Sequence, residues 1–177
     1  MSLDSYIFKT TKKGVMAKKK EIINARNKDL SQGVKCGNQT VFVYRLGDDR
    51  SNAIDHLKPD VHWRRYNHIT AWISEKVFGN TGGKMDKYIG VLTKEDLLAL
   101  KDDCWKVFQH CILPDGTLSI DETYCAEIFP TLNMAYSGSA AYDKDFIEEI
   151  FNALDGIERL LRLATRPDVC FVFFAYF

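Results

Sequence analysis

A run of nine apolar residues ends the chain, and it constrains the fold more than any other feature. Residues 169–177 read VCFVFFAYF. The run is too short for a membrane-spanning helix, which needs about 20 apolar residues, and it is short for a helix of the protein interior. Its valine and phenylalanine residues favour a β-strand, and a strand that is apolar at every position must be covered on both faces. We therefore expect a C-terminal strand at the centre of a sheet.

Other segments predict the remaining elements of one α+β domain over residues 1–177. β-Branched and aromatic residues predict short strands at 3–8, 40–46 and 87–92. Apolar residues at steps of three and four predict three main helices, at about 63–78, 93–111 and 143–164. Thr93 with Asp96 resembles a capping box at the start of the second helix. The expected architecture is a three- or four-stranded sheet with the C-terminal strand central, packed by these helices.

A lysine-rich segment follows the first predicted strand. Residues 1–30 carry eight lysines and arginines against three acids, whereas the whole chain carries 24 of each sign. The apolar stripe in this segment is thin, so we expect a loop-like insert at about 10–35, in which 18–27 could form a short helix. Lys18, Lys19 and Lys20 are candidate contacts for nucleic acid, and a solvated charge run is the alternative.

Composition and missing motifs exclude several classes of protein. Five cysteines, an odd number without a C-x-x-C pair, indicate reduced thiols, and no apolar signal-peptide run occurs near the start. We therefore expect a cytoplasmic protein without a membrane segment. The chain has neither of the common glycine-rich nucleotide motifs and no histidine, cysteine and carboxylate cluster at metal-ligand spacing, so we expect no cofactor and no metal.

Residues 62–72, HWRRYNHITAW, form the stretch densest in chemistry. The triplet His68-Ile69-Thr70 matches the H-x-T motif of two-histidine phosphoesterases, but that chemistry needs two such motifs and the chain has one. On a helical wheel Arg65 lies at the edge of the apolar face beside Trp72, where it could clamp a phosphate or carboxylate. The alternative is an arginine that covers the edge of the core and pairs with a surface acid.

The segment 137–143, SGSAAYD, is a second candidate for anion binding. Its backbone N–H groups and the Ser139 hydroxyl could hold an anion, or Ser139 or Asp143 could cap the helix that follows. If this segment and the arginine segment lie on one rim of the sheet, the two together form one pocket. Its members would be Arg64 or Arg65, Asn67, Ser139 and Asp143.

Four segments resemble, in order and approximate spacing, a family of small bacteriophage and gut-bacterial proteins for which no activity is established. The family's motifs are an M-G-L-D-M-Y-L start, Y-W-R-K-A-N-A-I-H-x-W-F, L-x-x-L-x-x-x-C and L-P-T…G-S-x-x-Y-D. The counterparts here are MSLDSYIF, WRRYNHITAW, LLALKDDC and FPTLNMAYSGSAAYD. The resemblance singles out Trp63, Arg64, Asn67, Ser139 and Asp143 among others. The chain departs from it where the family has histidine, since Thr70 stands there and His68 stands at the family's alanine.

These observations favour three functions in a definite order. The first is a phage-type accessory protein that binds a host protein or an anionic small molecule without catalysis, with counter-defence as one concrete form. The second is an enzyme acting on a phosphorylated or nucleotide substrate, with Arg65 as clamp and Asp143 or His68 as acid–base group. The third is a nucleic-acid-binding protein that uses the lysine-rich segment. We assign no catalytic residue, and the sequence indicates no oligomeric state.

Overall fold

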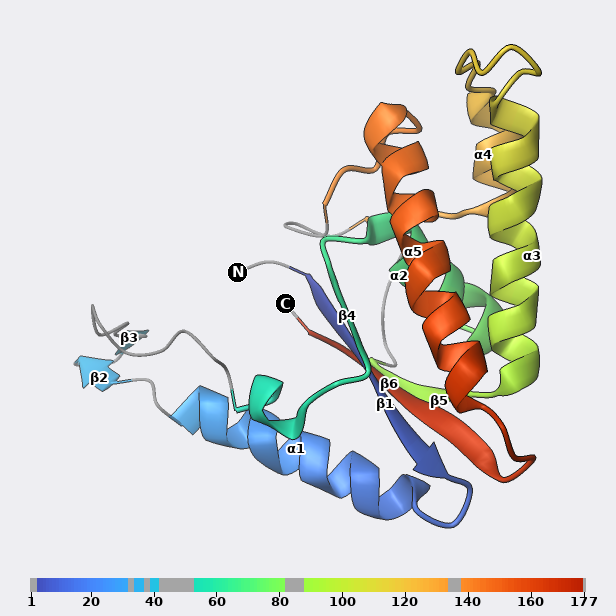
Figure 1. Cartoon of the computed structure of the whole chain (residues 1–177). Helices are drawn as coiled ribbons and strands as arrows, with labels where there is room; N and C mark the ends of the chain where they lie inside the picture. Colours follow the sequence, from blue (N-terminus) through green and yellow to red (C-terminus); the bar gives the residue numbers. More distant parts are fainter. Residues whose placement is uncertain are drawn as a thin grey trace.

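The main sheet has four antiparallel strands in the order β4-β1-β6-β5, so the C-terminal strand lies inside the sheet as expected (Figure 1). The computed structural model describes residues 3–31, 34–36, 39–41, 53–81, 88–133 and 138–176. The sheet strands are β1 (Asp4–Thr11), β4 (Val61–Arg64), β5 (Ile89–Leu92) and β6 (Val169–Tyr176). A separate pair consists of β2 (Val34–Cys36) and β3 (Gln39–Val41). The prediction of an α+β fold with a three- or four-stranded sheet is confirmed.

Strand β6 is apolar throughout because its side chains enter two cores. Successive side chains of a strand point to opposite faces of the sheet. Phe171 and Phe173 pack into the larger core, on the side of the long helices, while Val172 and Phe174 pack into a smaller core on the other side. All four side chains are buried. The expectation that both faces of this strand are covered is therefore confirmed.

Helix α1 (Val15–Ser31) covers the smaller core (Figure 1). The prediction of a loop-like insert at about 10–35 was wrong over most of its length, since α1 has 17 residues. The apolar stripe looked thin because only a narrow line of the helix meets the sheet. Ile22 and Ala25 are buried there against β1 and β6, whereas Lys20 and Lys28 are exposed.

The other face of the sheet is covered by α3 (Lys94–Cys111) and α5 (Lys144–Leu163), with the short α4 (Glu122–Ile128) beside α3 (Figure 1). The capping box of Thr93 and Asp96 is present, and the predicted inner face of α3 is buried. That face consists of Leu97, Leu100, Cys104, Val107 and Cys111. Among the helices of the described residues, none has the length and apolar content to cross a membrane.

The segment expected to be one helix over 63–78 divides into three elements. It contains the end of β4, helix α2 (Asn67–Trp72) and a π-helical turn, η2 (Ile73–Val77). Val61 and Trp63 are buried whereas His62 and Arg64 are exposed, which is the alternation of an edge strand rather than the period of a helix. The strand expected at 40–46 begins with β3, and its residues 42–46 lie outside the described residues.

Candidate functional site

A tight turn joins β4 to α2 and carries Arg64, Arg65 and Tyr66 to one edge of the sheet. Arg65 has φ 62°, a left-handed conformation that costs a residue with a side chain about 1–3 kcal/mol. Two backbone hydrogen bonds hold it there, from Arg65 N to Leu3 O at 2.8 Å and from Asn67 N to Arg65 O at 3.0 Å. Tyr66 lies between them with φ −81° and ψ 82°, the geometry of an inverse γ-turn. The turn is thus fixed by the backbone.

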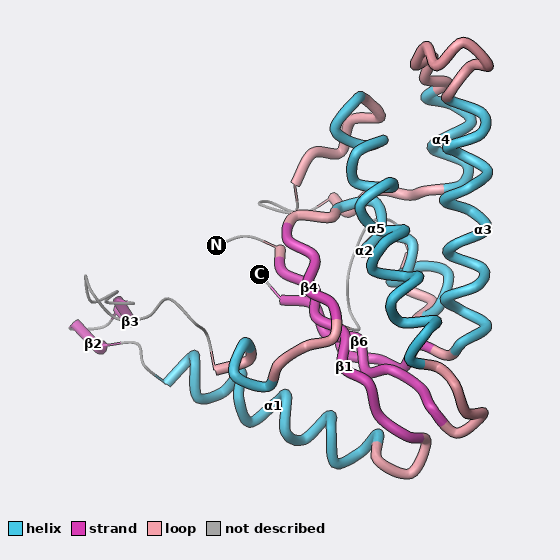
Figure 2. The backbone as a smooth tube through the Cα atoms, in the orientation of Figure 1, coloured by secondary structure: helices cyan, strands magenta, loops and turns pink. Residues whose placement is uncertain are grey.

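The loop that leads into α5 lies against this turn (Figure 2). Gly138 has φ +100°, and a Cβ atom at this position would stand 2.3 Å from the carbonyl oxygen of Arg65. Only glycine fits such an approach without displacing one of the two segments. The two segments that the sequence singled out therefore meet in space, at the contact between Gly138 and Arg65.

A pocket of about 540 Å³ opens between the turn, this loop and the first half of α5. Its charged and polar groups come from the end of β4, the turn, α2, the loop and α5, and the buried ring of Phe146 adds an apolar surface. The lining residues are Arg64, Arg65, Tyr66, His68, Gly138, Ser139, Asp145, Phe146, Glu148, Glu149 and Asn152. A volume of this size suits a small organic ligand such as a nucleotide.

Three of the six residues predicted for this site do not line the pocket. Trp63 is buried in the larger core, where its indole packs 3.0 Å from the position that a Cβ on Gly156 would take. Asn67 is buried. Its side-chain amide donates a hydrogen bond to the Leu132 carbonyl oxygen and accepts one from the Leu132 N–H. Asp143 caps α5 by accepting hydrogen bonds from the N–H groups of residues 145 and 146. These three side chains have structural roles, and the alternative reading of Asp143 as a cap is the one observed.

Arg64, Arg65 and Ser139 do line the pocket together. Both arginines are exposed, and neither guanidinium has an ion pair or hydrogen bond with any described residue. The expected position of Arg65 beside Trp72 on a helix was wrong, because Arg65 precedes the helix. The Trp72 indole is buried and donates instead to Asp103 at 3.0 Å.

A histidine–glutamate pair, which the sequence did not reveal, lines the same pocket as the arginines. His68 Nδ1 stands 3.1 Å from Glu149 Oε2, and the Ile69 N–H donates to Glu149 Oε1 at 2.9 Å. His68 is fully buried, with its ring against Tyr142 and Phe146. Its Nε2 has no hydrogen-bond partner among the described residues. A neutral imidazole that donates from Nδ1 to the carboxylate presents Nε2 as an acceptor.

The charge of Glu149 also acts on Tyr66 in the pocket wall. Burial raises the pKa of the Tyr66 phenol, the nearby Glu149 carboxylate raises it further, and a hydrogen bond with Asn152 opposes the rise. Tyr66 therefore stays protonated well above neutral pH and can donate a hydrogen bond. One sequence signal could have found Glu149. Asp145, Glu148, Glu149 and Asn152 form a polar stripe at steps of three and four, on a helix whose opposite face is apolar.

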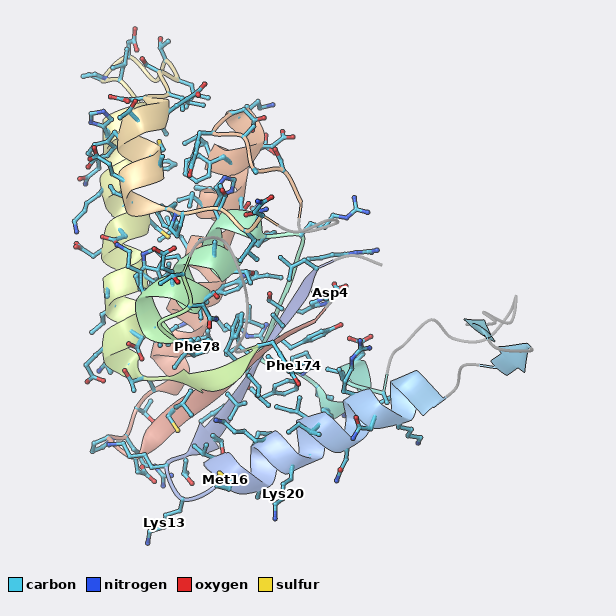
Figure 3. The ribbon with its side chains drawn as sticks, turned by 180° about the vertical axis from the view of Figure 1, so that it is seen from behind. Asp4, Lys13, Met16, Lys20, Phe78 and Phe174 are labelled. Atoms are coloured by element: carbon cyan, nitrogen blue, oxygen red, sulfur yellow. The ribbon has the colours of Figure 1, made fainter. Side chains whose placement is uncertain are left out.

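The candidate lysines lie on the other side of the sheet from the pocket. Lys18 pairs with Glu21 and lies over the Phe8 ring, and Lys19 is partly buried. Lys20 is exposed and, like Lys13, extends away from the sheet (Figure 3). Lys18 and Lys19 are thus less exposed than Lys20, and contact of these lysines with nucleic acid stays a prediction.

Four of the cysteines pack in the protein interior. Cys104, Cys111, Cys125 and Cys170 are buried free thiols, and Cys111 and Cys125 touch with sulfurs 3.6 Å apart. Burial raises the pKa of Cys104 strongly and that of Cys125 to about 12, so both remain protonated and unreactive near neutral pH. Within the described ranges no group of three or more histidine, cysteine or acidic side chains could hold a metal ion.

Comparison with known proteins adds no assignment to this geometry. No model of a known protein family matches the chain, and neither the curated proteins nor the solved structures include a match. The resemblance to phage proteins therefore stays a prediction, and the function has to be argued from the pocket.

Proposed function

We propose that the protein binds a small anionic ligand, carrying a phosphate or carboxylate group, in the pocket beside the β4–α2 turn. The observation that carries this proposal is the pair of guanidiniums, Arg64 and Arg65, that line one pocket without a partner among the described residues. A guanidinium presents a planar set of donors that matches two oxygens of a phosphate or carboxylate. Two of them in consecutive positions favour an anion with several oxygens.

Neutral donors in the same pocket support the proposal. The Ser139 hydroxyl oxygen accepts a hydrogen bond from the N–H of Ala141 at 3.1 Å, which leaves its hydrogen available for a ligand. The Tyr66 phenol stays protonated because its pKa is raised, and it can donate as well. Neutral donors fix the orientation of an anion, while the arginines supply the opposite charge.

The pocket favours one form of the expected accessory function. Sequestering a small phosphorylated molecule requires a concave site and no turnover, and counter-defence by removal of a nucleotide signal would take this form. Direct inhibition of a host protein would instead require a broad complementary surface. We therefore place ligand binding ahead of host-protein binding.

The test is to titrate the wild type with inorganic phosphate, adenosine 5′-monophosphate, succinate and uncharged adenosine. Binding is measured by calorimetry and by thermal shift. We expect at least one anion to bind and adenosine not to bind. Arg64→Ala or Arg65→Ala should weaken binding at least about tenfold, or about 1.4 kcal/mol.

The matched control is Arg162→Ala, which removes an exposed arginine from the far end of α5, outside the pocket. This variant should bind the anion as the wild type does. Binding that is equally strong in all three arginine variants, or no binding of any anion, would contradict the proposal.

A further inference from the structure

We infer that the ligand is a zwitterion, with an anionic group held by the arginines and an ammonium group held by the acidic side of α5. This inference rests on the proposed function and narrows it to a ligand class, of which aminoalkyl phosphates are the simplest members. Simple anions would bind less tightly than zwitterions of the same size.

The first observation is the separation of charge across the pocket. Arg64 and Arg65 lie on the turn, whereas Asp145, Glu148 and Glu149 come from one face of α5. Among the described residues, no ion pair within 4.0 Å joins the two sides. An anion placed at the arginines alone would also feel the repulsion of these carboxylates. A ligand that carries an ammonium on its other end turns this repulsion into attraction.

The three carboxylates on this face of α5 differ in how firmly other residues of the protein hold them. Glu149 is held by His68 and the Ile69 N–H, and Glu148 forms an exposed pair with Lys144 at 3.2 Å. Such a surface pair contributes little and exchanges readily with solvent. The Asp145 carboxylate has no partner among the described residues, and the cap of α5 is already provided by Asp143. Asp145 is therefore the carboxylate best placed to receive a cation.

The second, independent observation is the buried Nε2 of His68, which has no hydrogen-bond partner among the described residues. This atom is enclosed and belongs to a residue that lines the pocket. A buried polar atom without a hydrogen bond is costly, so native sites that contain one commonly use it for a ligand or a bound water. With Nδ1 facing the Glu149 carboxylate, a neutral ring carries its proton on Nδ1 and its lone pair on Nε2. In that neutral form Nε2 would accept from the N–H groups of an ammonium and would offer no donor to the oxygens of an anion.

The test compares phosphoethanolamine with ethyl phosphate, which has the same phosphate ester and lacks the amine. The wild type should bind phosphoethanolamine at least about tenfold more tightly than ethyl phosphate. Asp145→Asn should reduce this preference severalfold and leave ethyl phosphate bound at least as well, because a repulsive charge is removed. Asp145→Ser serves as a second neutral variant at this exposed position. Asp155→Asn, on the same helix and outside the pocket, should bind both probes as the wild type does.

The outcomes separate this inference from the proposed function. If the wild type binds both probes equally, or ethyl phosphate more tightly, the zwitterion inference is wrong while anion binding stands. If the preference persists unchanged in both Asp145 variants, the ammonium is not held by this side of α5 and the inference fails at that step. If neither probe nor any other anion binds, the proposed function fails and the inference falls with it.

Discussion

Replacing Glu149 with alanine should destabilise the fold as well as alter the pocket. The carboxylate accepts two hydrogen bonds, from the Ile69 N–H at 2.9 Å and from His68 Nδ1 at 3.1 Å, and its side chain is 10% exposed. A hydrogen bond to a charged group contributes about 1.5–3 kcal/mol, and its loss leaves a buried donor without a partner. Water can enter from the pocket and replace part of what is lost. We therefore expect Glu149→Ala to lower the free energy of unfolding by about 3 kcal/mol, the low end of that range for two bonds.

The measurement is equilibrium unfolding in urea, followed by tryptophan fluorescence. The control is Glu148→Ala, the preceding residue on the same helix, whose exposed pair with Lys144 should be worth no more than about 0.5 kcal/mol. Glu149→Gln keeps an oxygen for the Ile69 N–H and should recover about half of the loss. If Glu149→Ala and Glu148→Ala unfold at the same urea concentration, the buried pair does not hold α2 to α5 and our reading of it is wrong.

Three further predictions concern other parts of the chain. Burial raises the pKa of Cys125 from 9.0 to about 12. The stability that the protonated thiol contributes is therefore intact below pH 9 and is lost as the pH rises toward 12. In urea unfolding at increasing alkaline pH, the free energy of unfolding should fall less steeply in Cys125→Ala than in the wild type. Asp143→Ala should lose about 1 kcal/mol of unfolding free energy and Asp143→Ser should restore most of it, with phosphate binding by calorimetry unchanged in the serine variant, because this residue is a cap and not a ligand. Gly138→Ala should lower the free energy of unfolding by about 1–3 kcal/mol and weaken phosphate binding, because the new Cβ would stand 2.3 Å from Arg65 O. Unaltered unfolding and binding would show that the loop and the turn do not touch.

The parts of the fold that could be predicted from the sequence are those encoded by neighbouring residues. The inner face of α3 repeats at steps of three and four and opens with the Thr93–Asp96 box, so its start and its buried side were both predicted correctly. The run of β6 is apolar at every position, which by itself predicted that both faces of the strand are buried. Strand β4 was not predicted, because His62 and Tyr66 also fit a helical spacing and the strand is too short for its alternation to dominate. Most of the length of helix α1 was predicted as a loop, because most of its surface faces solvent and its apolar stripe is narrow.

The candidate site was predictable only in part, for a different reason. Arginine and serine are common in anion sites, so residue type and the family resemblance sufficed to select Arg64, Arg65 and Ser139. Glu149 escaped because its partners are about 80 positions away in the chain, and no local pattern encodes such a pairing. The contact of Gly138 with Arg65 is equally non-local. Contacts of this kind depend on how the sheet and α5 pack, which the sequence of either segment does not contain.

The geometry of α2 shows what the predicted resemblance to phage proteins, with histidine expected at position 70 rather than 68, would mean for the pocket. His68 and Thr70 are two residues apart, so their side chains point about 200° apart around the helix axis. His68 accordingly faces Glu149 on α5, whereas the Thr70 hydroxyl bonds Ser5 of β1 at 2.9 Å in the core. A relative with alanine at the first position and histidine at the second would direct its imidazole toward the sheet and leave the α5 side without one. The His68–Glu149 pair therefore depends on histidine standing at position 68, and exchanging the residues at 68 and 70 would break it.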